Sequence, residues 1–364
     1  MLYLKFYNIY IYYITHIQTY TTMYNNYKIV CNTAAGRRRY MQYLIPLVIS
    51  SDLVDRYDIW VNTNDNVDIE FFTLLAKKYP KINLVWQPEG IVDGINSINS
   101  FYRYCTEEDT IYIKLDDDIV WMEDGFFKKI IDFRINNPQY FVVSPLVINN
   151  AICTYILQLA NKIKLSTYMN AASNHRIMWK KGTFAVQLHN WFINKYLKTE
   201  RVNELYCGEY IIGMNRFSIN CILWFGSEMK KFDGVVPGDD EEFLSCIKST
   251  QLKMSNAIDG NTVISHFAFF TQRNILDKCK ILEQYGEYLH EKWSKDEKMK
   301  MIDHEVQNIM TIVNENAKEL YSKELIYKTV PKSNKTKIKG IFKKYQKAIR
   351  NKFELTRNKT YIQD

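Results

Sequence analysis

Three consecutive aspartates, Asp116, Asp117 and Asp118, are the residues of this sequence with the clearest capacity for chemistry. They follow residues 111–115, where apolar and polar side chains alternate with the period of a β-strand. Adjacent carboxylates repel one another and are poorly suited to the interior of a strand. At the exposed end of a strand they could hold Mg²⁺ or Mn²⁺, which take oxygen ligands and bind phosphates as well. The alternative is an acidic turn that caps the next helix.

A second acidic cluster follows a Val-Val-Pro-Gly sequence and consists of Asp239, Asp240, Glu241 and Glu242. The next residues, 243–247, are typical of a helix. Acids at the start of a helix are stabilised by its dipole and can cap it, which explains one or two of the four. A carboxylate that is held at a helix start and directed into a cleft could also act as a general base.

Three arginines, Arg37, Arg38 and Arg39, open the first predicted helix directly after the loop 33–36. Backbone N–H groups at a helix start favour anions, and arginine adds charge-assisted contacts to phosphate. The alternative is an exposed basic turn. The loop matches neither Gly-x-Gly-x-x-Gly nor Gly-Lys-Ser/Thr, so neither dinucleotide-binding nor P-loop chemistry is indicated.

His266 lies in an apolar segment, Val-Ile-Ser-His-Phe-Ala-Phe-Phe. A single histidine in such a strand is either a metal ligand or a hydrogen-bonded core residue. The same two interpretations apply to His175 and His189.

The elements that would position these residues alternate between strand and helix. Strands are predicted at 27–32, 57–62, 82–86, 111–115, 140–148 and 217–225, and helices at 37–50, 68–79, 94–105 and from 126 to about 138. This order predicts an α/β fold with a mainly parallel, Rossmann-like sheet flanked by helices. Ligands of such sheets bind beyond the carboxyl ends of the strands, where the loops 33–36, 62–65 and 116–118 would converge.

Composition limits the class of protein. The chain has 364 residues, of which 47 % are hydrophobic, and seven cysteines without a Cys-x-x-Cys pair. We therefore expect neither a disulfide framework nor a zinc ribbon, and we expect a reducing, cytoplasmic location. No run of eighteen apolar residues predicts a membrane span. We expect residues 1–24 to be a disordered lead or a start placed too early, 25–275 to be the main domain, and 276–327 to be a helical extension.

Residues 328–364 form a basic tail. The stretch 328–352 holds ten Lys and Arg and no Asp or Glu, whereas the whole chain carries a net charge of +8. Apolar residues at helical spacing between the lysines predict an amphipathic helix that could lie on an anionic membrane surface, at the cytoplasmic face. The alternative is a solvated tail. The nearly neutral remainder of the chain argues against nucleic acid as a partner.

Together these motifs resemble nucleotide-sugar glycosyltransferases of the GT-A fold, over about residues 27–272. The resemblance rests on four features in order: the loop 32–36, an Asp-x-Asp motif at 116–118, an acidic motif at 238–241, and the late His266. The stretches 60–65 and 265–273 also look like glycosyltransferase-like proteins of bacteria and large DNA viruses.

The resemblance implies a role for each matching residue. Asp118 and His266 would bind Mn²⁺ or Mg²⁺, with Asp116 on the metal's water shell or on the ribose. Asp240 would be the general base, with the acids beside it shaping the site, although which of the acids is the base stays open. The residues expected along the nucleotide are Thr33, Ala34, Arg38, Asp65, Asp116 and Asp117, and those expected in the catalytic cluster are Asp239, Asp240 and Glu241.

The implied activity is metal-dependent transfer of a sugar from a nucleotide-sugar donor, with a UDP-sugar favoured, to a hydroxyl of a glycan, lipid or protein. Inversion at the anomeric carbon is expected, and retention stays open. Residues 150–216 would form the acceptor side, where Trp179, His189 and Trp191 could contact sugar rings or could be ordinary core residues. The alternatives are a sugar nucleotidyltransferase, an inactive carbohydrate-binding protein, and an adaptor that docks on membranes through its tail.

Overall fold

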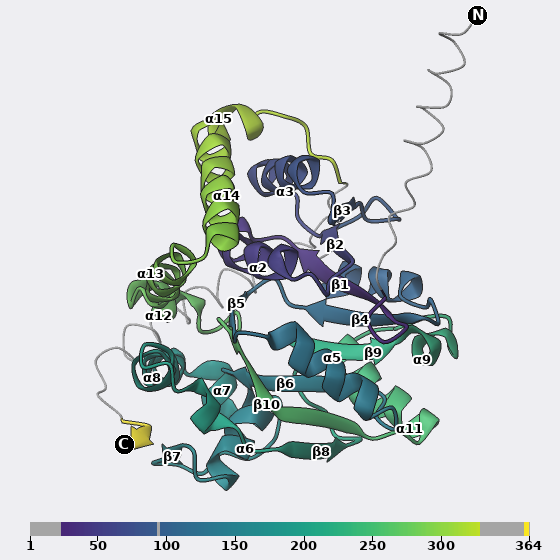
Figure 1. Ribbon diagram of the computed structural model, residues 1–364, viewed down its shortest axis with the longest axis vertical. Coiled ribbons are helices and arrows are strands. Elements are labelled where there is room, and N and C mark those ends of the chain that lie inside the picture. Colours follow the sequence, from purple (N-terminus) through teal and green to yellow (C-terminus); the bar gives the residue numbers. More distant parts are fainter. Residues whose placement is uncertain (1–22, 93–94, 328–359, 364) are drawn as a thin grey trace, which may run out of the picture.

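Nine strands form one central sheet in the part of the chain that the structure describes, residues 23–92, 95–327 and 360–363 of a computed structural model. The strands lie in the order β3-β2-β1-β4-β9-β6-β10-β5, and β8 pairs with the first half of β10. Figure 1 shows β3, β2, β1, β4, β9 and β6 following one another in this order, with helices around them. Their bounds are β1 Lys28–Ala35, β2 Arg56–Val61, β3 Ile82–Val85, β4 Thr110–Leu115, β5 Ile119–Met122, β6 Val143–Ile148, β8 Glu209–Gly213, β9 Cys221–Phe225 and β10 Asn256–His266.

Six of these nine strands run in the same direction, so the sheet is mostly parallel. β1 is parallel to β2 and β4, β2 is parallel to β3, and β6 is parallel to β10. β9 lies antiparallel between β4 and β6, which gives β4 and β6 the same direction. β5 and β8 run antiparallel to β10. The predicted α/β class, with a mainly parallel, Rossmann-like sheet flanked by helices, is confirmed.

Three of the four helices predicted between the strands, α2, α3 and α5, begin and end close to their predicted positions. The first helix, α2, continues through Pro46 to Ser50, and α3 is capped by Asp65, whose carboxylate accepts from the N–H groups of Val67 and Asp68. The bounds in this half are α2 Arg38–Ser50, α3 Asn66–Lys78, α4 Ile95–Ile98, α5 Phe126–Asn136 and α6 Ala151–Leu159, with the 3₁₀ segment η1 at Asn99–Tyr104.

Two predicted elements differ from those observed. The helix expected at 94–105 is one short turn, α4, followed by the 3₁₀ segment η1. The strand expected from 217 begins at Cys221, because residues 217–220 form the loop that leads into the antiparallel strand β9. For the helix, apolar periodicity does not distinguish an α-helix from a 3₁₀ segment, because a 3₁₀ turn can bury Phe101 and Tyr102 equally well.

The helical extension predicted at 276–327 packs against the domain. Its bounds are α12 Arg273–Lys278, α13 Ile281–Trp293, α14 Glu297–Glu315 and α15 Ala317–Leu320. Apolar residues at spacings of three and four, Ile302, Val306, Ile309 and Val313, form the buried stripe of α14. This stripe faces α2 and α3, so the extension covers the first half of the sheet (Figure 1).

Residues 150–216 form a separate set of short elements beside β6 and β10. They are α6, β7 Lys164–Leu165, α7 Arg176–Lys180, α8 Gly182–Phe192, the π-helical η2 Ile193–Leu197, the 3₁₀ segment η3 Val202–Leu205 and β8. The short elements after β9 are α9 Gly226–Lys230, α10 Asp240–Glu242, η4 Phe243–Lys248 and α11 Ser249–Leu252. Near the end of the chain, β11 Ile362–Gln363 pairs antiparallel with β7.

Two predictions concern parts of the chain outside the described residues. The lead lies outside up to residue 22, and so does the whole basic stretch 328–352 with its expected membrane contact. Among the described residues, no helix combines the length and the apolar character that crossing a membrane requires.

Because the core under the site is tightly packed, we expect a large loss of stability when a buried side chain of β4 is shortened. Leu115, the residue before the aspartates, is completely buried and pairs with Cys221 of β9. We expect Leu115→Ala to lower the free energy of unfolding by about 2–5 kcal/mol, because it leaves a cavity in a packed core. The matched control is Leu159→Ala at the end of α6, where the side chain is 51 % exposed. Urea denaturation measures both variants, and an equal effect would contradict this account of the core.

Candidate active site

Four parallel strands end at one edge of the sheet, and most of the predicted functional residues gather there. β1 ends at Ala35, β4 at Leu115, β6 at Ile148 and β10 at His266. A cavity of about 400 Å³ opens at this edge, within the usual size of a ligand pocket. Its lining includes Asp116–Asp118, Asp239–Glu241 and His266. A second cavity, of about 460 Å³, lies beside α13, and none of the predicted site residues lines it.

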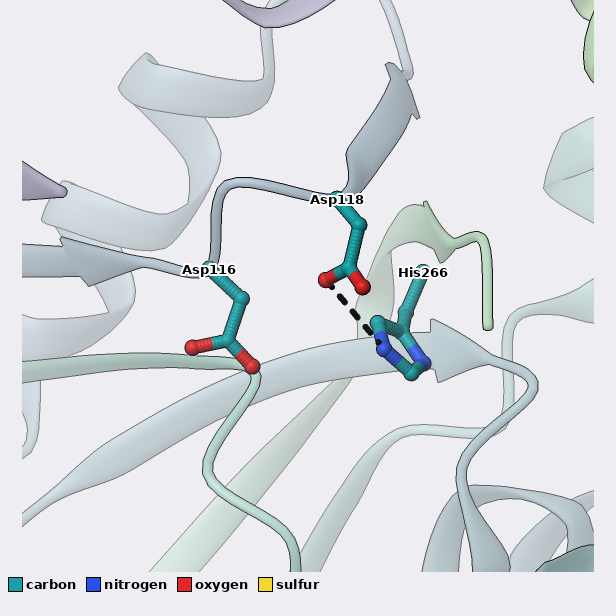
Figure 2. Close-up of side chains that lie close together, drawn as sticks. All are labelled: Asp116, Asp118 and His266. Carbon is teal, nitrogen blue, oxygen red and sulfur yellow. Dashed lines mark ion pairs between the residues drawn. The ribbon is translucent and has the colours of Figure 1, made fainter. Parts of the chain in front are cut away.

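Asp116, Asp118 and His266 lie close enough to share one metal ion. One ligand atom from each lies within 4.8 Å of the others, which is close to the spacing of about 4.2 Å between opposite ligands of Mg²⁺. Asp118 and His266 are buried and Asp116 is half-buried. Figure 2 shows the three side chains directed toward one another from the end of β4 and the end of β10.

The hydrogen bond of His266 suits a metal ligand. Its Nδ1 lies 3.3 Å from the carbonyl oxygen of Asn149, which can only accept, so Nδ1 carries the proton. The other nitrogen, Nε2, is then an acceptor in the neutral ring, and it lies 3.4 Å from Asp118 Oδ1. Two acceptor atoms at this distance need a cation or a proton between them. The donor set of two carboxylates and an imidazole therefore fits a divalent cation.

The second oxygen of Asp118 faces two guanidinium groups. Arg37 Nη1 lies 3.0 Å from Asp118 Oδ2, and Arg273 Nη2 lies 3.5 Å from the same atom. Burial alone would raise the pKa of Asp118, but the guanidinium groups of Arg37 and Arg273 hold it well below its ordinary value. Asp118 is therefore ionised at neutral pH and can bind a cation through Oδ1.

Asp117 holds the loop between β1 and α2. Its carboxylate accepts from the N–H of Gly36 at 3.1 Å and from Arg37 Nε at 2.9 Å, and Arg37 Nη2 contacts its other oxygen. Gly36 allows the close packing, since a Cβ there would lie 3.1 Å from the carbonyl oxygen of Asn62. Asp117 thus fixes the position of Arg37 at the cavity.

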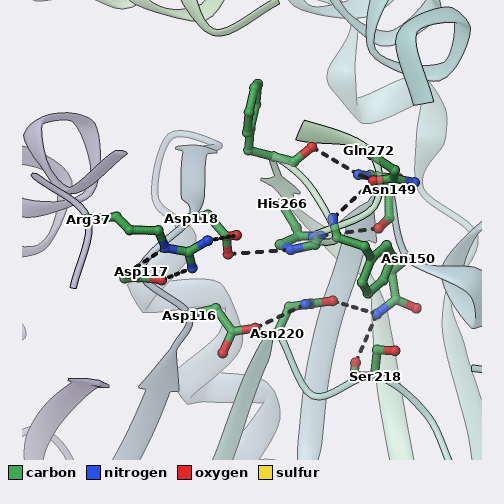
Figure 3. A network of polar contacts seen from close by, with 12 residues as sticks. Arg37, Asp116, Asp117, Asp118, Asn149, Asn150, Ser218, Asn220, His266 and Gln272 are labelled. Carbon is green, nitrogen blue, oxygen red and sulfur yellow. Dashed lines mark hydrogen bonds and ion pairs between the residues drawn. The ribbon is translucent and has the colours of Figure 1, made fainter. Parts of the chain in front are cut away.

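Asp116 is held by a lysine of its own strand and by a chain of amides. Lys114 Nζ donates to it at 2.6 Å, as expected for residues two apart on one face of a strand. Asn220 Nδ2 donates to its other oxygen at 3.0 Å, and Asn150 Nδ2 donates to Asn220 Oδ1 at 2.9 Å. Figure 3 shows this chain beside the contacts of Asp118 and His266. Loops after β4 and β6 and before β9 are thereby joined.

Arg216 pairs with three of the four acids of the second acidic cluster, and Asp240 is the acid with which it forms no ion pair. Arg216 binds Asp239 and Glu241 at 2.8 Å and lies 3.6 Å from Glu242. Asp239 also caps α10 by accepting from the N–H of Glu242. These contacts agree with the capping interpretation for part of the cluster.

Asp240 has a different environment from the other acids. It accepts from the hydroxyl of Tyr102 at 3.0 Å. Burial raises its pKa above the ordinary value, against the opposing effects of Lys114 and the Tyr102 hydrogen bond. A half-buried carboxylate with a raised pKa, in the lining of a cavity, can accept a proton from a bound hydroxyl.

Several residues expected at a ligand lie elsewhere. Ala34 and Trp179 line the cavity. Thr33, Arg38 and Asp65 do not: Thr33 is buried against the hydroxyl of Tyr57, Arg38 pairs with Asp68 at 2.7 Å, and Asp65 caps α3.

His189 and Trp191 are buried core residues of α8. His189 bonds to the hydroxyl of Tyr285 and to the carbonyl oxygen of Phe267, both at 2.9 Å. Burial lowers its pKa to about 4, so it is neutral. The core interpretation of this histidine therefore holds.

Sequence reasoning missed several residues of the site. Of the three arginines, Arg38 was expected along the nucleotide, but Arg37 is the one that faces the carboxylates, because neighbouring helix positions point about 100° apart. The period of β4 was a signal for the Lys114–Asp116 pair. No local pattern pointed to the others, which are Asn149, Asn150, Asn220, Arg216 and Arg273.

The comparisons with known proteins do not identify the chain. No protein-family model matches it, and no curated protein sequence matches it. Among solved structures, it is similar to a CMP:2-keto-3-deoxy-manno-octonic acid synthetase complexed with CTP, with a TM-score of 0.37. The identity is 10 %, and the match covers 71 % of this chain and 98 % of that chain. A similarity of this size is no evidence about function.

The proximity of Asp116, Asp118 and His266, hereafter the metal-binding trio, predicts that the protein binds a divalent cation. We expect millimolar Mn²⁺ to raise the thermal unfolding midpoint, and we expect Asp118→Asn to abolish that increase, because it removes a charged ligand. The control is Asp124→Asn, an exposed acid that pairs with Lys292 outside the cavity. The assignment fails if Asp118→Asn retains the full Mn²⁺-dependent increase.

Proposed function

We propose that this chain is a divalent-metal-dependent glycosyltransferase of the GT-A type, which moves a sugar from a nucleotide-sugar donor to an acceptor hydroxyl. The observation that carries the proposal is one cavity, at the carboxyl edge of a Rossmann-like sheet, that is lined both by the trio Asp116, Asp118 and His266 and by the half-buried Asp240. This edge is where open α/β sheets bind nucleotides.

The trio would hold the cation at the donor diphosphate. A bound Mn²⁺ or Mg²⁺ would neutralise the charge that develops on the leaving nucleoside diphosphate. The chain supports these ligands from several sides, since Asn149 orients His266 and Asn220 orients Asp116. Such supporting contacts fix ligand geometry before the substrate binds.

Asp240 would accept the proton of the acceptor hydroxyl as that oxygen attacks the anomeric carbon. Its raised pKa brings it nearer to neutral pH, where a general base is most effective. Direct attack from the face opposite the leaving group gives the expected inversion. Asp239 and Glu241 would serve this step indirectly, because their ion pairs with Arg216 position the start of α10.

An aromatic surface at the cavity favours a glycan as the acceptor. The ring of Trp179 lies 4.8 Å from that of Phe269 and 5.6 Å from that of Phe270, and all three residues line the cavity. Phe270 is 55 % exposed, so its ring is accessible. Aromatic rings provide a rigid apolar surface beside polar groups, which suits the mixed character of a sugar ring.

The first test is nucleotide release from a panel of UDP-, GDP- and CMP-sugars with Mn²⁺. We expect one donor to be hydrolysed or transferred in a metal-dependent manner, and Asp240→Asn to lower kcat about 10²–10⁴-fold with little change in donor KM. Glu242→Gln, which removes a neighbouring acid outside the cavity lining, should behave as wild type. If no donor is consumed, the transferase proposal is wrong.

A sugar nucleotidyltransferase is the second candidate, and the position of Arg37 favours it. An arginine directly after the first βα loop, facing metal-binding carboxylates, would suit a nucleoside triphosphate. Release of pyrophosphate from CTP or UTP with a sugar or sugar phosphate would identify this activity. Nucleotide release from a nucleotide-sugar would identify the transferase.

The Tyr102 hydrogen bond predicts a pH effect. The hydroxyl stabilises the ionised form of Asp240, so Tyr102→Phe removes an interaction that lowers the pKa of Asp240. The base would then stay protonated to a higher pH, and the acidic limb of the kcat/KM profile should move to higher pH. Tyr104→Phe, at a residue that is 54 % exposed, is the control. An unchanged or oppositely shifted limb would exclude Asp240 as the base.

A further inference from the structure

The metal-binding trio lies beside the aromatic surface of the cavity, which consists of Trp179, Phe269 and Phe270. The rings of His266 and Phe269 have centroids 4.9 Å apart, and their planes are inclined at 65°. The ring of Phe269 lies in turn 4.8 Å from that of Trp179. A metal ligand and an aromatic ring that could contact a sugar are therefore separated by a single side chain.

Gln272, directly before α12, is a completely buried amide that bonds toward both groups. Its Oε1 accepts from Nδ2 of Asn149 and from the backbone N–H of Phe269, both at 3.0 Å. Its Nε2 donates to the carbonyl oxygen of Met178, the residue before Trp179. These partners fix the orientation of the amide, because the two N–H groups can only donate and the carbonyl can only accept.

Asn149 provides the link from Gln272 to the trio. Its backbone has a φ of 67°, in the left-handed region that asparagine tolerates, and its carbonyl oxygen lies 3.3 Å from Nδ1 of His266. Its Nδ2 donates to the carbonyl oxygen of Phe267 at 2.9 Å as well as to Gln272. Figure 3 shows Gln272, Asn149 and His266 in this network. Gln272 therefore holds the residue whose carbonyl orients the imidazole.

The carbonyl groups of α7 provide the link from Gln272 to the aromatic surface. α7 has only five residues, and the last carbonyls of a helix have no partner within it. Gln272 binds the carbonyl oxygen of Met178, and the hydroxyl of Thr271 donates to the carbonyl oxygen of Trp179. Two consecutive side chains thus hold the backbone that carries the indole ring.

We propose that Gln272 is a positioning residue that aligns the metal-binding trio with the aromatic surface, so that a sugar ring on this surface lies at a fixed place relative to the bound cation. The inference deepens the proposed function and rests on it for the sugar. Gln272 acts through Asn149 and Met178. Buried hydrogen-bond networks restrict the groups that they contain, and here one amide belongs to both links. Loss of this amide should therefore disturb both groups at once.

A purely local role for Gln272 makes a different prediction. Gln272 occupies the position before the first residue of α12, although its side chain forms no capping hydrogen bond there. If it served only to start this helix, its replacement would lower stability and leave both the trio and Trp179 unchanged.

The first experiment is a titration of the full chain with Mn²⁺, followed by the electron paramagnetic resonance signal of the free ion. Gln272→Met keeps a similar length and removes the hydrogen bonds of the amide. We expect it to bind Mn²⁺ about tenfold more weakly, at the lower end of the range for residues that support metal ligands. The matched control is Gln158→Met, because Gln158 also bridges backbone groups, those of Met169, but lies outside the cavity lining.

The second experiment measures the quenching of Trp179 fluorescence by acrylamide. Trp179 is half-buried and Trp86 is 42 % exposed, whereas the other five tryptophans are buried. A Trp86→Phe background therefore leaves Trp179 as the accessible indole. In this background we expect Gln272→Met to raise the quenching constant and Gln158→Met to leave it unchanged. The thermal unfolding midpoint verifies that each variant is folded.

Two further variants each remove one link. Asn149→Gly tolerates the left-handed backbone and removes the amide that joins Gln272 to the trio, so we expect weaker binding of Mn²⁺ and unchanged quenching. Thr271→Val removes the hydroxyl that holds Trp179, so we expect stronger quenching and unchanged binding of Mn²⁺. If Gln272→Met does not fold, these two variants decide the matter.

A folded Gln272→Met that changes only one property, or neither, would overturn the proposal, and so would a wild type that does not bind Mn²⁺. A single-link variant that changes both properties, or neither, would also overturn it. No readout requires a sugar donor or turnover. Both effects without consumption of any nucleotide-sugar would contradict the transferase and retain the role of Gln272, and turnover without these effects would do the reverse.

Discussion

The structure of this site depends on one constraint, which is the repulsion among three adjacent carboxylates at the end of a buried strand. Each aspartate meets this constraint with a different partner. Asp116 pairs with Lys114 of the same strand, Asp117 binds Arg37 after β1, and Asp118 lies between His266 and guanidinium groups. Because burial makes an unpaired charge costly, each pairing holds a separate segment of the chain in place. The edge of the sheet is thereby organised around these carboxylates.

The partners reach the site from segments that are far apart in the sequence. Asn149 and Asn150 follow β6, Asn220 precedes β9, and His266 ends β10. They join one polar network, in which the side-chain amide of Asn150 holds Asn220 and the backbone carbonyl of Asn149 holds His266 (Figure 3). Networks of this kind restrict the side chains that they contain. The ligand atoms are therefore directed by the fold and not by their own loop alone.

The second acidic cluster illustrates how environment separates residues of one type. Asp239 and Glu241 are neutralised by Arg216, which makes them structural at the start of α10. Asp240, between them in the sequence, faces the cavity with a tyrosine hydroxyl as its partner and a raised pKa. Asp239 caps the helix and Asp240, one position later, is the candidate base, because consecutive residues of a helix point in different directions.

The sequence by itself determined six of the nine strands of the sheet, most of the helices between the early strands and the edge at which ligands would bind, because hydrophobic periodicity is local and the carboxyl ends of parallel strands meet at one edge. It also indicated Asp116, Asp118 and His266, whose convergence the structure shows. Only the tertiary structure decided that β9 enters antiparallel between β4 and β6, that His189 belongs to the core, and that Arg37 faces the cavity in place of Arg38. These outcomes depend on which segments pack together and on a rotation of one helical residue, and neither is encoded in local spacing.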